Sequence, residues 1–296
     1  MRFCSVIVLL FFANSVFSQS YQSGFDELVF YADVMSNASE GKNRLYAEGK
    51  FEELFISKLE EKNSFQETFD QLKWISKIED SEHHFKIFTW FVEVDGDKFS
   101  HFGIIQKSDG TIVNLRDNYS NPYDIEYDIL DGNNWIGAYY YDMKEYKKNG
   151  ETYYLLLGYD PGNGKNKRKI LEVLSFDENG NPVFGKEVFK SIDPEKRTNI
   201  KSRIVIEYSK NASATLTFDD QLNIIMFENI ISVMTPEEGP TLLPDGSYKA
   251  YKQEGDYWIY KDKVFDQVSS EPPTDGSHNR QEGLFGSPKS SEKKEK

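Results

Sequence analysis

The spacing of apolar residues divides the chain into two parts. Up to about residue 77, apolar residues recur every three or four positions, which is the period of an amphipathic helix. Ser23 is a helix-capping residue, and Ser64-Phe-Gln-Glu67 is a capping box that predicts another helix start. The apolar faces are formed by Phe25, Leu28, Val29 and Ala32, then Phe51, Leu54, Phe55 and Leu59, then Phe65, Phe69 and Leu72. The pattern predicts two or three short helices over residues 24–77, with a break near residues 36–43.

From His83 onward, apolar and polar residues alternate, which is the period of a β-strand. His84–Val94 and Lys98–Gln106 are predicted strands, joined at Asp95-Gly96 by a two-residue hairpin turn. Further strands are predicted at Gly137–Asp142, Glu151–Tyr159, Lys169–Phe176, Val183–Phe189, Arg203–Tyr208, Ala212–Phe218, Leu222–Phe227, Tyr248–Tyr251 and Tyr257–Val264. Because short turns join consecutive strands, the sequence predicts an antiparallel meander.

The predicted fold class is therefore α+β and mostly β. Short N-terminal helices are expected to pack on one face or end of a large, curled antiparallel sheet. A small propeller-like arrangement and a barrel remain alternatives. Four segments are predicted: a signal peptide over residues 1–18, a helical segment over 19–82, a β domain over 83–268 and a disordered tail over 269–296.

The first eighteen residues have the pattern of an export signal. Arg2 is followed by the apolar run Cys4–Phe12, and the small residue Ser18 precedes the expected cleavage point. The run is shorter than the roughly 20 residues that span a bilayer, so no membrane span is expected after cleavage. The sequence thus predicts a protein of the periplasm or the extracellular space.

Composition narrows the class of protein. Cys4 is the single cysteine of the chain, so the mature protein contains none, which is typical of a bacterial exported protein. Loss of Arg2 leaves 34 basic and 49 acidic residues, a net charge of −15 that disfavours nucleic-acid binding. Aromatic residues make up 15% of the chain; they indicate sheet first and stacking on sugars or peptides second.

The histidines give no catalytic or metal motif. His83 and His84 are adjacent in a predicted strand, so they would point to opposite faces. In the predicted hairpin His101 lies opposite Trp90, which favours a packed or rim histidine. A Ser/His/Asp site assembled from distant strands would have to take its base from these three residues.

A row of carboxylates is the candidate site with the clearest spacing. Tyr123–Asp128 alternates, which predicts a strand with Asp124, Glu126 and Asp128 on one face. Together with Asp131 these could bind Ca²⁺ through oxygen ligands, or two of them could serve as the acid and base of a glycosidase. A solvated, charged edge strand is the preferred interpretation. Apart from this Ca²⁺ alternative, the sequence predicts no cofactor.

The segment Gly158–Asn166 only superficially matches a phosphate-binding loop, because its glycine spacing is one residue too long. A long hairpin turn with solvated basic residues is preferred, and an anion contact at this turn is the alternative. The basic residues of the turn are Lys165, Lys167, Arg168 and Lys169.

Several strand-like segments resemble a family of uncharacterised exported proteins from Bacteroidota-type bacteria. The segments are Leu155–Gly158, Lys169–Phe176, Gly180–Gly185 and Arg203–Ser209, and the resemblance extends loosely over residues 84–265. The resemblance implies an exported bacterial protein and assigns no site residue.

Two hypotheses on function follow. The first is a non-catalytic envelope or secreted protein that binds a protein or glycan partner or has a structural role. The second is a secreted hydrolase that acts on glycan or peptide through carboxylates such as Asp124, Glu126 or Asp128.

Overall fold

The computed structural model describes residues 24–264, apart from residues 122, 149, 163 and 237. The predicted signal peptide and the predicted disordered tail lie outside these residues. Strands contain 49% of the residues and helices 15%, which confirms the α+β, mostly β class. None of the sheets closes into a barrel.

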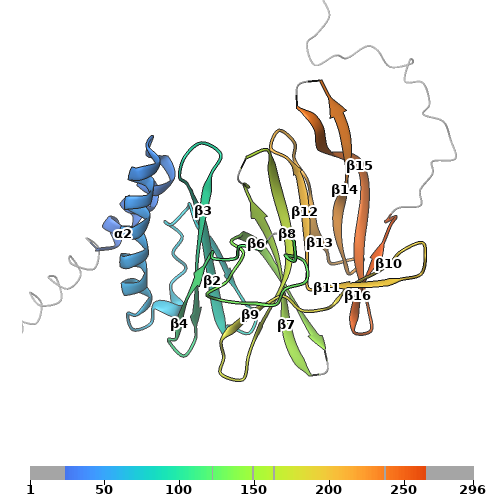
Figure 1. The fold of residues 1–296 in the computed structure, drawn as a ribbon. Coiled ribbons are helices and arrows are strands. Elements are labelled where there is room, and N and C mark those ends of the chain that lie inside the picture. The colour runs from blue at the N-terminus through green and yellow to red at the C-terminus, as the bar shows by residue number, and fades with distance from the viewer. Residues whose placement is uncertain (1–23, 122, 149, 163, 237, 265–296) are drawn as a thin grey trace, which may run out of the picture. The chain divides into compact units, whose positions relative to one another are not determined.

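The helices occupy the N-terminal part of the described chain (Figure 1). One covers residues 24–37 and the next, α2, covers Gly41–Leu59. The prediction of a helix from the capping box is wrong, because only a single 3₁₀ turn, Ser64–Gln66, forms there. The Ser64 hydroxyl does not cap a new helix but donates to the carbonyl of Leu59, and Gln106 donates to the Ser64 hydroxyl at 2.8 Å. Ser64 therefore ties the end of α2 to the sheet.

Three sheets follow in place of one curled sheet. The first has the order β1 (Ser76–Glu79), β2 (Phe85–Glu93), β3 (Phe99–Lys107) and β4 (Ile112–Arg116). The second has the order β5 (Leu130–Asp131), β9 (Pro182–Phe184), β8 (Asn166–Phe176), β7 (Glu151–Asp160) and β6 (Tyr139–Lys148), and β12 (Arg203–Ser209) also pairs with β8. The third has the order β11 (Thr198–Lys201), β10 (Phe189–Ile192), β16 (Tyr257–Lys261), β15 (Gly239–Glu254), β14 (Ile224–Thr235) and β13 (Leu216–Asp219).

Neighbouring strands are antiparallel in these sheets except for β10 and β16, which are parallel. The middle sheet is buried on both faces, and its strand β7 accordingly contains the continuous apolar run Leu155–Leu157. A strand of this kind cannot lie at the surface of a single curled sheet. It requires a further layer on each side.

Three hydrophobic clusters hold the layers together. In the first, Phe51 and Phe55 of α2 pack on Phe88 and Trp90 of the first sheet. The second cluster joins the opposite face of the first sheet to the middle sheet, and the third joins the middle sheet to the third sheet. The order of layers is therefore helices, first sheet, middle sheet and third sheet (Figure 1).

The register of the β2–β3 hairpin differs by one residue from the prediction. The turn contains three residues, Asp95–Asp97, with Asp97 in the left-handed region at φ 57°. His101 therefore pairs with Phe91, and Trp90 pairs with Phe102. A slip of one residue moves each side chain of the returning strand to the other face. His101 consequently faces the middle sheet, whereas Trp90 faces the helices, and the predicted contact of His101 with Trp90 is wrong.

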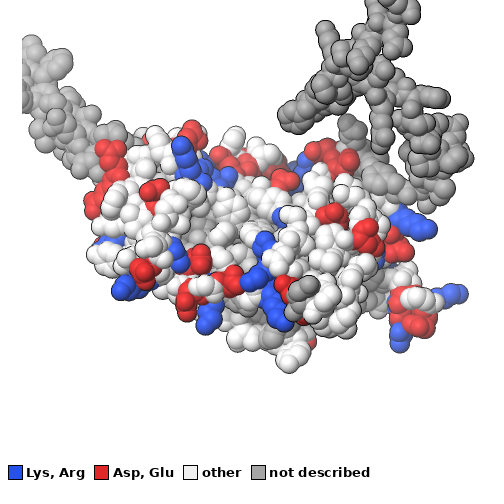
Figure 2. Space-filling view, turned by 90° about the horizontal axis from the view of Figure 1, so that it is seen from above, with Lys and Arg blue, Asp and Glu red and all other residues white. Residues whose placement is uncertain are grey.

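Charged side chains of both signs are interspersed on the face seen in Figure 2. The excess of acidic residues is thus spread over the surface in this view and broken by lysine and arginine. Among the described residues, no helix is long and apolar enough to cross a membrane.

Candidate functional site

The segment that contains the three predicted carboxylates is not a strand. Residues 123–127 form turns in the connection between β4 and β5. Asp124 accepts a hydrogen bond from Asn121 at 2.9 Å, and Glu126 forms an ion pair with Lys201. Asp128 accepts a hydrogen bond from the Tyr119 hydroxyl at 2.8 Å.

A buried arginine explains the course of this segment. The guanidinium of Arg203 donates to the carbonyls of Ile125 and Asp128, and its Nε donates to Glu172 at 2.6 Å. Arg203 and Glu172 are both fully buried, and the Tyr140 hydroxyl donates to the second Glu172 oxygen at 2.6 Å. Because these two backbone carbonyls bind the buried guanidinium of Arg203, the segment forms turns. The alternation of its side chains alone predicted a strand.

The row of carboxylates on which the calcium hypothesis depended is therefore not formed. Asp124, Glu126 and Asp128 turn to separate protein partners. Within residues 24–264 as described, no three His, Cys, Asp or Glu side chains are grouped to hold a metal ion.

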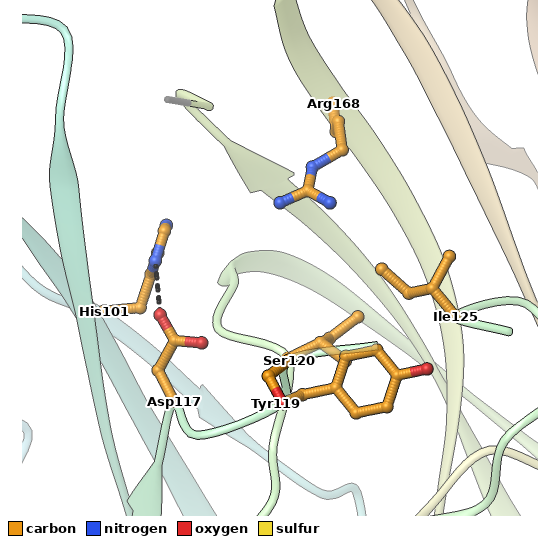
Figure 3. A pocket seen from close by; sticks show the side chains of 7 residues that line it. His101, Asp117, Tyr119, Ser120, Ile125 and Arg168 are labelled. Carbon is orange, nitrogen blue, oxygen red and sulfur yellow. Dashed lines mark hydrogen bonds and ion pairs between the residues drawn. The ribbon is translucent and has the colours of Figure 1, made fainter. Parts of the chain in front are cut away.

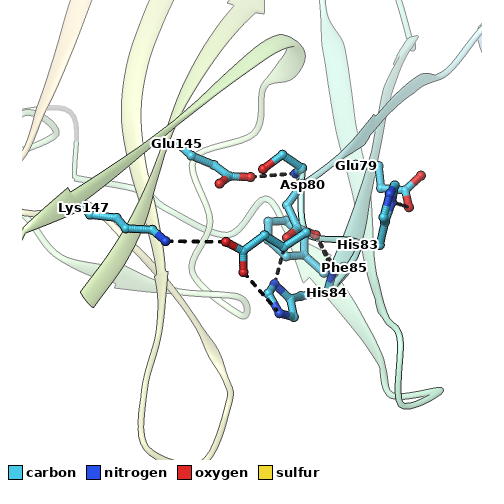
Figure 4. A network of polar contacts seen from close by, with 9 residues as sticks. Glu79, Asp80, His83, His84, Phe85, Glu145 and Lys147 are labelled. Carbon is cyan, nitrogen blue, oxygen red and sulfur yellow. Dashed lines mark hydrogen bonds and ion pairs between the residues drawn. The ribbon is translucent and has the colours of Figure 1, made fainter. Parts of the chain in front are cut away.

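His83 and His84 belong to the turn between β1 and β2 and not to a strand (Figure 4). His83 contacts Glu79 at 2.6 Å, and His84 contacts the buried Asp80 at 2.9 Å. Asp80 also accepts the backbone amides of His84 and Phe85, so it organises the turn. Both histidine side chains are largely exposed, and the network is that of a stabilised turn.

His101 lines a hollow of about 290 Å³ between the first and middle sheets (Figure 3). Its Nδ1 lies 3.1 Å from Asp117 Oδ2, and its Nε2 lies 3.2 Å from Asp160 Oδ1. Arg168 Nε donates to the other oxygen of Asp160 at 2.7 Å. The side chains of His101 and Asp160 are 4% and 0% exposed, so this chain of alternating charges crosses the interior between two sheets.

A glycine permits the close packing around His101. Gly137 has φ +67°, and a Cβ there would lie 2.6 Å from Asp117 Oδ2 and 2.8 Å from His101 Cβ. A side chain at this position would displace the ion pair. The feature of the sequence that corresponds to this close packing is therefore Gly137, directly after Trp135-Ile136. Its role follows only from the strand register, which places His101 beside it.

The two aspartates beside His101 determine its charge. Burial alone would lower the pKa of His101, but the hydrogen bonds and charges of Asp117 and Asp160 raise it to about 9. Burial alone would raise the pKa of Asp160, but His101 and Arg168 lower it to about 2. His101 is thus an imidazolium at neutral pH, and Asp160 is a carboxylate.

This arrangement does not match a Ser/His/Asp triad with His101 as its general base. Ser120 lines the hollow, but Nε2 of His101 faces Asp160, where a catalytic triad would have its serine. An imidazolium with a pKa near 9 cannot accept a proton at neutral pH. Glu48 does have a raised pKa of about 8, caused by burial and by Glu52, but it is enclosed between α2 and the first sheet.

The basic turn is also largely paired within the protein. Asn166 donates to Glu207 at 2.9 Å, Arg168 is bound to Asp160, and the Lys169 ammonium lies 4.6 Å from the centre of the Tyr141 ring. Lys165 lines a neighbouring hollow with Arg168. The turn is a hairpin between β7 and β8, as predicted.

An aromatic groove lies next to this hollow, between the same two sheets. It has a volume of about 420 Å³ and is lined by Met35, Ser36, Lys73, Trp74, Phe91, Glu93, Phe99, Tyr139 and Tyr159. Phe91 and Phe99 come from the first sheet, and Tyr139 and Tyr159 come from the middle sheet. This volume lies within the range of ligand pockets, which are mostly apolar with a few polar groups.

Local contacts hold the mouth of the groove. Arg44 of α2 donates to the carbonyls of Glu93 and Ala38, which joins the end of β2 to the connection between the helices. Trp74, just before β1, is 46% exposed, whereas the other three tryptophans, Trp90, Trp135 and Trp258, are buried. Trp74 is thus a large apolar side chain that remains in contact with solvent.

Sequence reasoning did not identify this groove. It is assembled from the helix end, the connection to β1 and two sheets, so its residues are scattered from Met35 to Tyr159. The available signal was β2 itself, in which Trp90 and Phe91 place large aromatic rings on opposite faces. An aromatic residue on each face predicts packing on both sides of the sheet.

Comparison of the chain with protein-family models, with curated proteins and with solved structures gave no match.

Proposed function

We propose that this protein is an exported, non-catalytic binding protein whose partner, an envelope protein or glycan, places a group in the aromatic groove. The observation that carries the proposal is the groove itself, with Trp74 46% exposed at its edge. Large exposed aromatic side chains in a concave site are costly unless they serve binding.

Export is part of the proposal and is supported by the sequence alone. The basic and apolar pattern of residues 1–18, the absence of cysteine after Cys4 and the resemblance to exported proteins of Bacteroidota-type bacteria favour it. The partner would then be a component of the periplasm, the outer surface or the medium.

The rival hydrolase finds less support in the geometry. Asp117 lines the His101 hollow, and the second carboxylate near it, Asp160, is buried behind His101. The pKa of Asp160 is lowered to about 2, whereas a general acid needs a raised pKa. Among the described residues, Glu93 is the carboxylate that lines the groove, and a glycosidase needs a pair.

Tryptophan fluorescence tests groove binding when the protein is compared with a Trp74→Phe variant, because Trp74 is the exposed one of four tryptophans. Muropeptides, chitooligosaccharides and β-glucan oligosaccharides are titrated into the full protein, and we expect at least one class to change the emission saturably. For protein partners, a photo-cross-linking amino acid replaces Trp74, and adducts from an envelope extract are identified. The matched control is the same replacement at Tyr46, which is 66% exposed on α2 and outside the groove.

Two results would contradict the proposal. If no oligosaccharide changes the emission and the cross-links at positions 74 and 46 are the same, the groove is not a binding site. If an oligosaccharide that binds is also cleaved, and Glu93→Gln abolishes that cleavage, the protein is a hydrolase.

A further inference from the structure

Four aromatic rings of the groove meet at steep angles and do not form a flat platform. The Phe91 ring is central, and the rings of Phe99, Tyr139 and Tyr159 lie 5.6, 5.9 and 6.2 Å from it between centroids. Their interplanar angles to Phe91 are 85°, 73° and 67°, so each stands steeply against it. Trp74 adds a fifth ring at the exposed edge.

The orientation of the rings selects the shape of the ligand group. Rings that share one plane offer a platform on which a flat group stacks. Rings that stand at steep angles offer several faces to one compact group, and the negative faces of aromatic rings attract a cation. Aromatic rings arranged in this way suit a quaternary ammonium, which is compact, rounded and positive.

Two side chains of opposite charge line the same groove. The Glu93 carboxylate is 44% exposed and lies 3.8 Å from the Arg44 guanidinium. Lys73 lies on the segment before β1, and its side chain is exposed. A carboxylate and an ammonium beside one group of aromatic rings fit a ligand that carries both charges.

We propose that the aromatic groove binds a compact zwitterionic group in which a quaternary ammonium is joined to a carboxylate or a phosphate. The ammonium packs against the rings of Phe91, Phe99, Tyr139 and Tyr159, and Glu93 supplies the negative charge beside it. Lys73 contacts the anionic end. This inference rests on the proposed function, because it names the group that the partner presents.

Five small probes separate the shape of the group from its charge. Glycine betaine and phosphocholine carry both charges, and choline carries only the cation. The compounds 3,3-dimethylbutan-1-ol and 3,3-dimethylbutanoate have the shapes of choline and betaine with carbon in place of the ammonium nitrogen. We expect choline and glycine betaine each to bind about tenfold more tightly than its carbon isostere, measured by tryptophan emission and calorimetry.

Two charge-removing variants assign the two ends of the ligand. Glu93→Gln is expected to weaken betaine, phosphocholine and choline alike, by about fivefold. Lys73→Gln is expected to weaken betaine and phosphocholine by a similar factor and to leave choline unchanged. The matched controls are Glu53→Gln and Lys62→Gln, at exposed positions outside the groove.

The outcomes distinguish this inference from the proposed function. Equal binding of choline and its isostere would overturn the cationic assignment but leave groove binding intact. Equal effects of Lys73→Gln on choline and betaine would overturn the zwitterion. If no probe binds at 50 mM while an oligosaccharide or a cross-linked protein occupies the groove, the inference fails alone. If nothing occupies the groove, both fail.

Discussion

The two hollows between the first and middle sheets use their polar residues in opposite ways. In the His101 hollow, each charge of the Asp117–His101–Asp160–Arg168 chain has a protein partner of the opposite sign. In the aromatic groove, the rings are partly exposed, and Glu93 has only a distant partner in Arg44. The two hollows adjoin, because Phe91, which lines the groove, is paired in the β2–β3 register with His101, which lines the other hollow.

The contrast explains why titratable residues are a poor guide here. A buried histidine between two aspartates has a strongly shifted pKa, and such a shift often marks an active site. In this protein the shift arises from internal ion pairs that join two layers, so it indicates a stabilising contact. The groove that we propose as the ligand site is marked by its aromatic rings and not by a buried ion pair.

Removal of Arg203 is expected to have the largest effect on stability. Arg203→Met leaves Glu172 buried without its cation and frees the carbonyls of Ile125 and Asp128. Breaking a buried pair in this way costs about 3–5 kcal/mol of unfolding free energy. Urea denaturation measures the loss. Because the freed segment lines the His101 hollow, acrylamide quenching of Trp74 in the remaining folded protein should stay unchanged.

A double variant tests the cause of that loss. Arg203→Met combined with Glu172→Gln removes both charges and keeps an acceptor for the Tyr140 hydroxyl. The double variant should be more stable than Arg203→Met alone. If it is no more stable, the unpaired carboxylate is not the main cost, and the contacts of Arg203 with the backbone carbonyls are.

The pH dependence of stability separates the His101 chain from the rest of the molecule. The pKa of His101 is about 9 in the folded protein and near 6.5 when unfolded. Its contribution is therefore fully present below pH 6.5 and is lost as the pH rises through 9. A shift of this size corresponds to roughly 3 kcal/mol, undiminished by solvent because the side chain is 4% exposed.

His101→Gln should accordingly destabilise the protein by roughly 3 kcal/mol at pH 6 and by much less at pH 10. Thermal unfolding of the variant and the wild type at both pH values measures the difference. Glu48, with a pKa raised to about 8, also lowers wild-type stability as the pH rises from 4.5 to 8, so the two proteins must be compared at each pH.

The sequence predicted elements well and contacts poorly. β-branched and aromatic residues bounded by turn signals located most strands, including β2, β3, β7 and β8, although β7 is a continuous apolar run and does not alternate. The short strands β1, β4, β5, β10 and β11 were missed, because two to five residues carry little periodicity. The continuation of β14 from Glu228 to Thr235 was also missed. It forms a two-stranded ribbon with the first residues of β15.

The candidate sites depended on details that no local pattern contains. One extra residue in the turn at Asp97 decided which face His101 occupies. Arg203, more than seventy residues away in the sequence, decided that Tyr123–Asp128 forms turns. Both are tertiary effects, and in both the local preference was overridden by a contact between layers.

Removal of Trp74 is expected to have the smallest effect on stability, and this is the strictest test of the contrast between the hollows. A side chain that is 46% exposed buries little apolar surface, so Trp74→Ala should lower the unfolding free energy by about 1 kcal/mol or less. Tyr46→Ala, at an exposed position on α2, should cost a similar amount. Urea denaturation of both variants measures this. A loss above about 3 kcal/mol for Trp74→Ala alone would mean that the ring holds the structure together, as His101 does, and the groove would then lose its claim to be a ligand site.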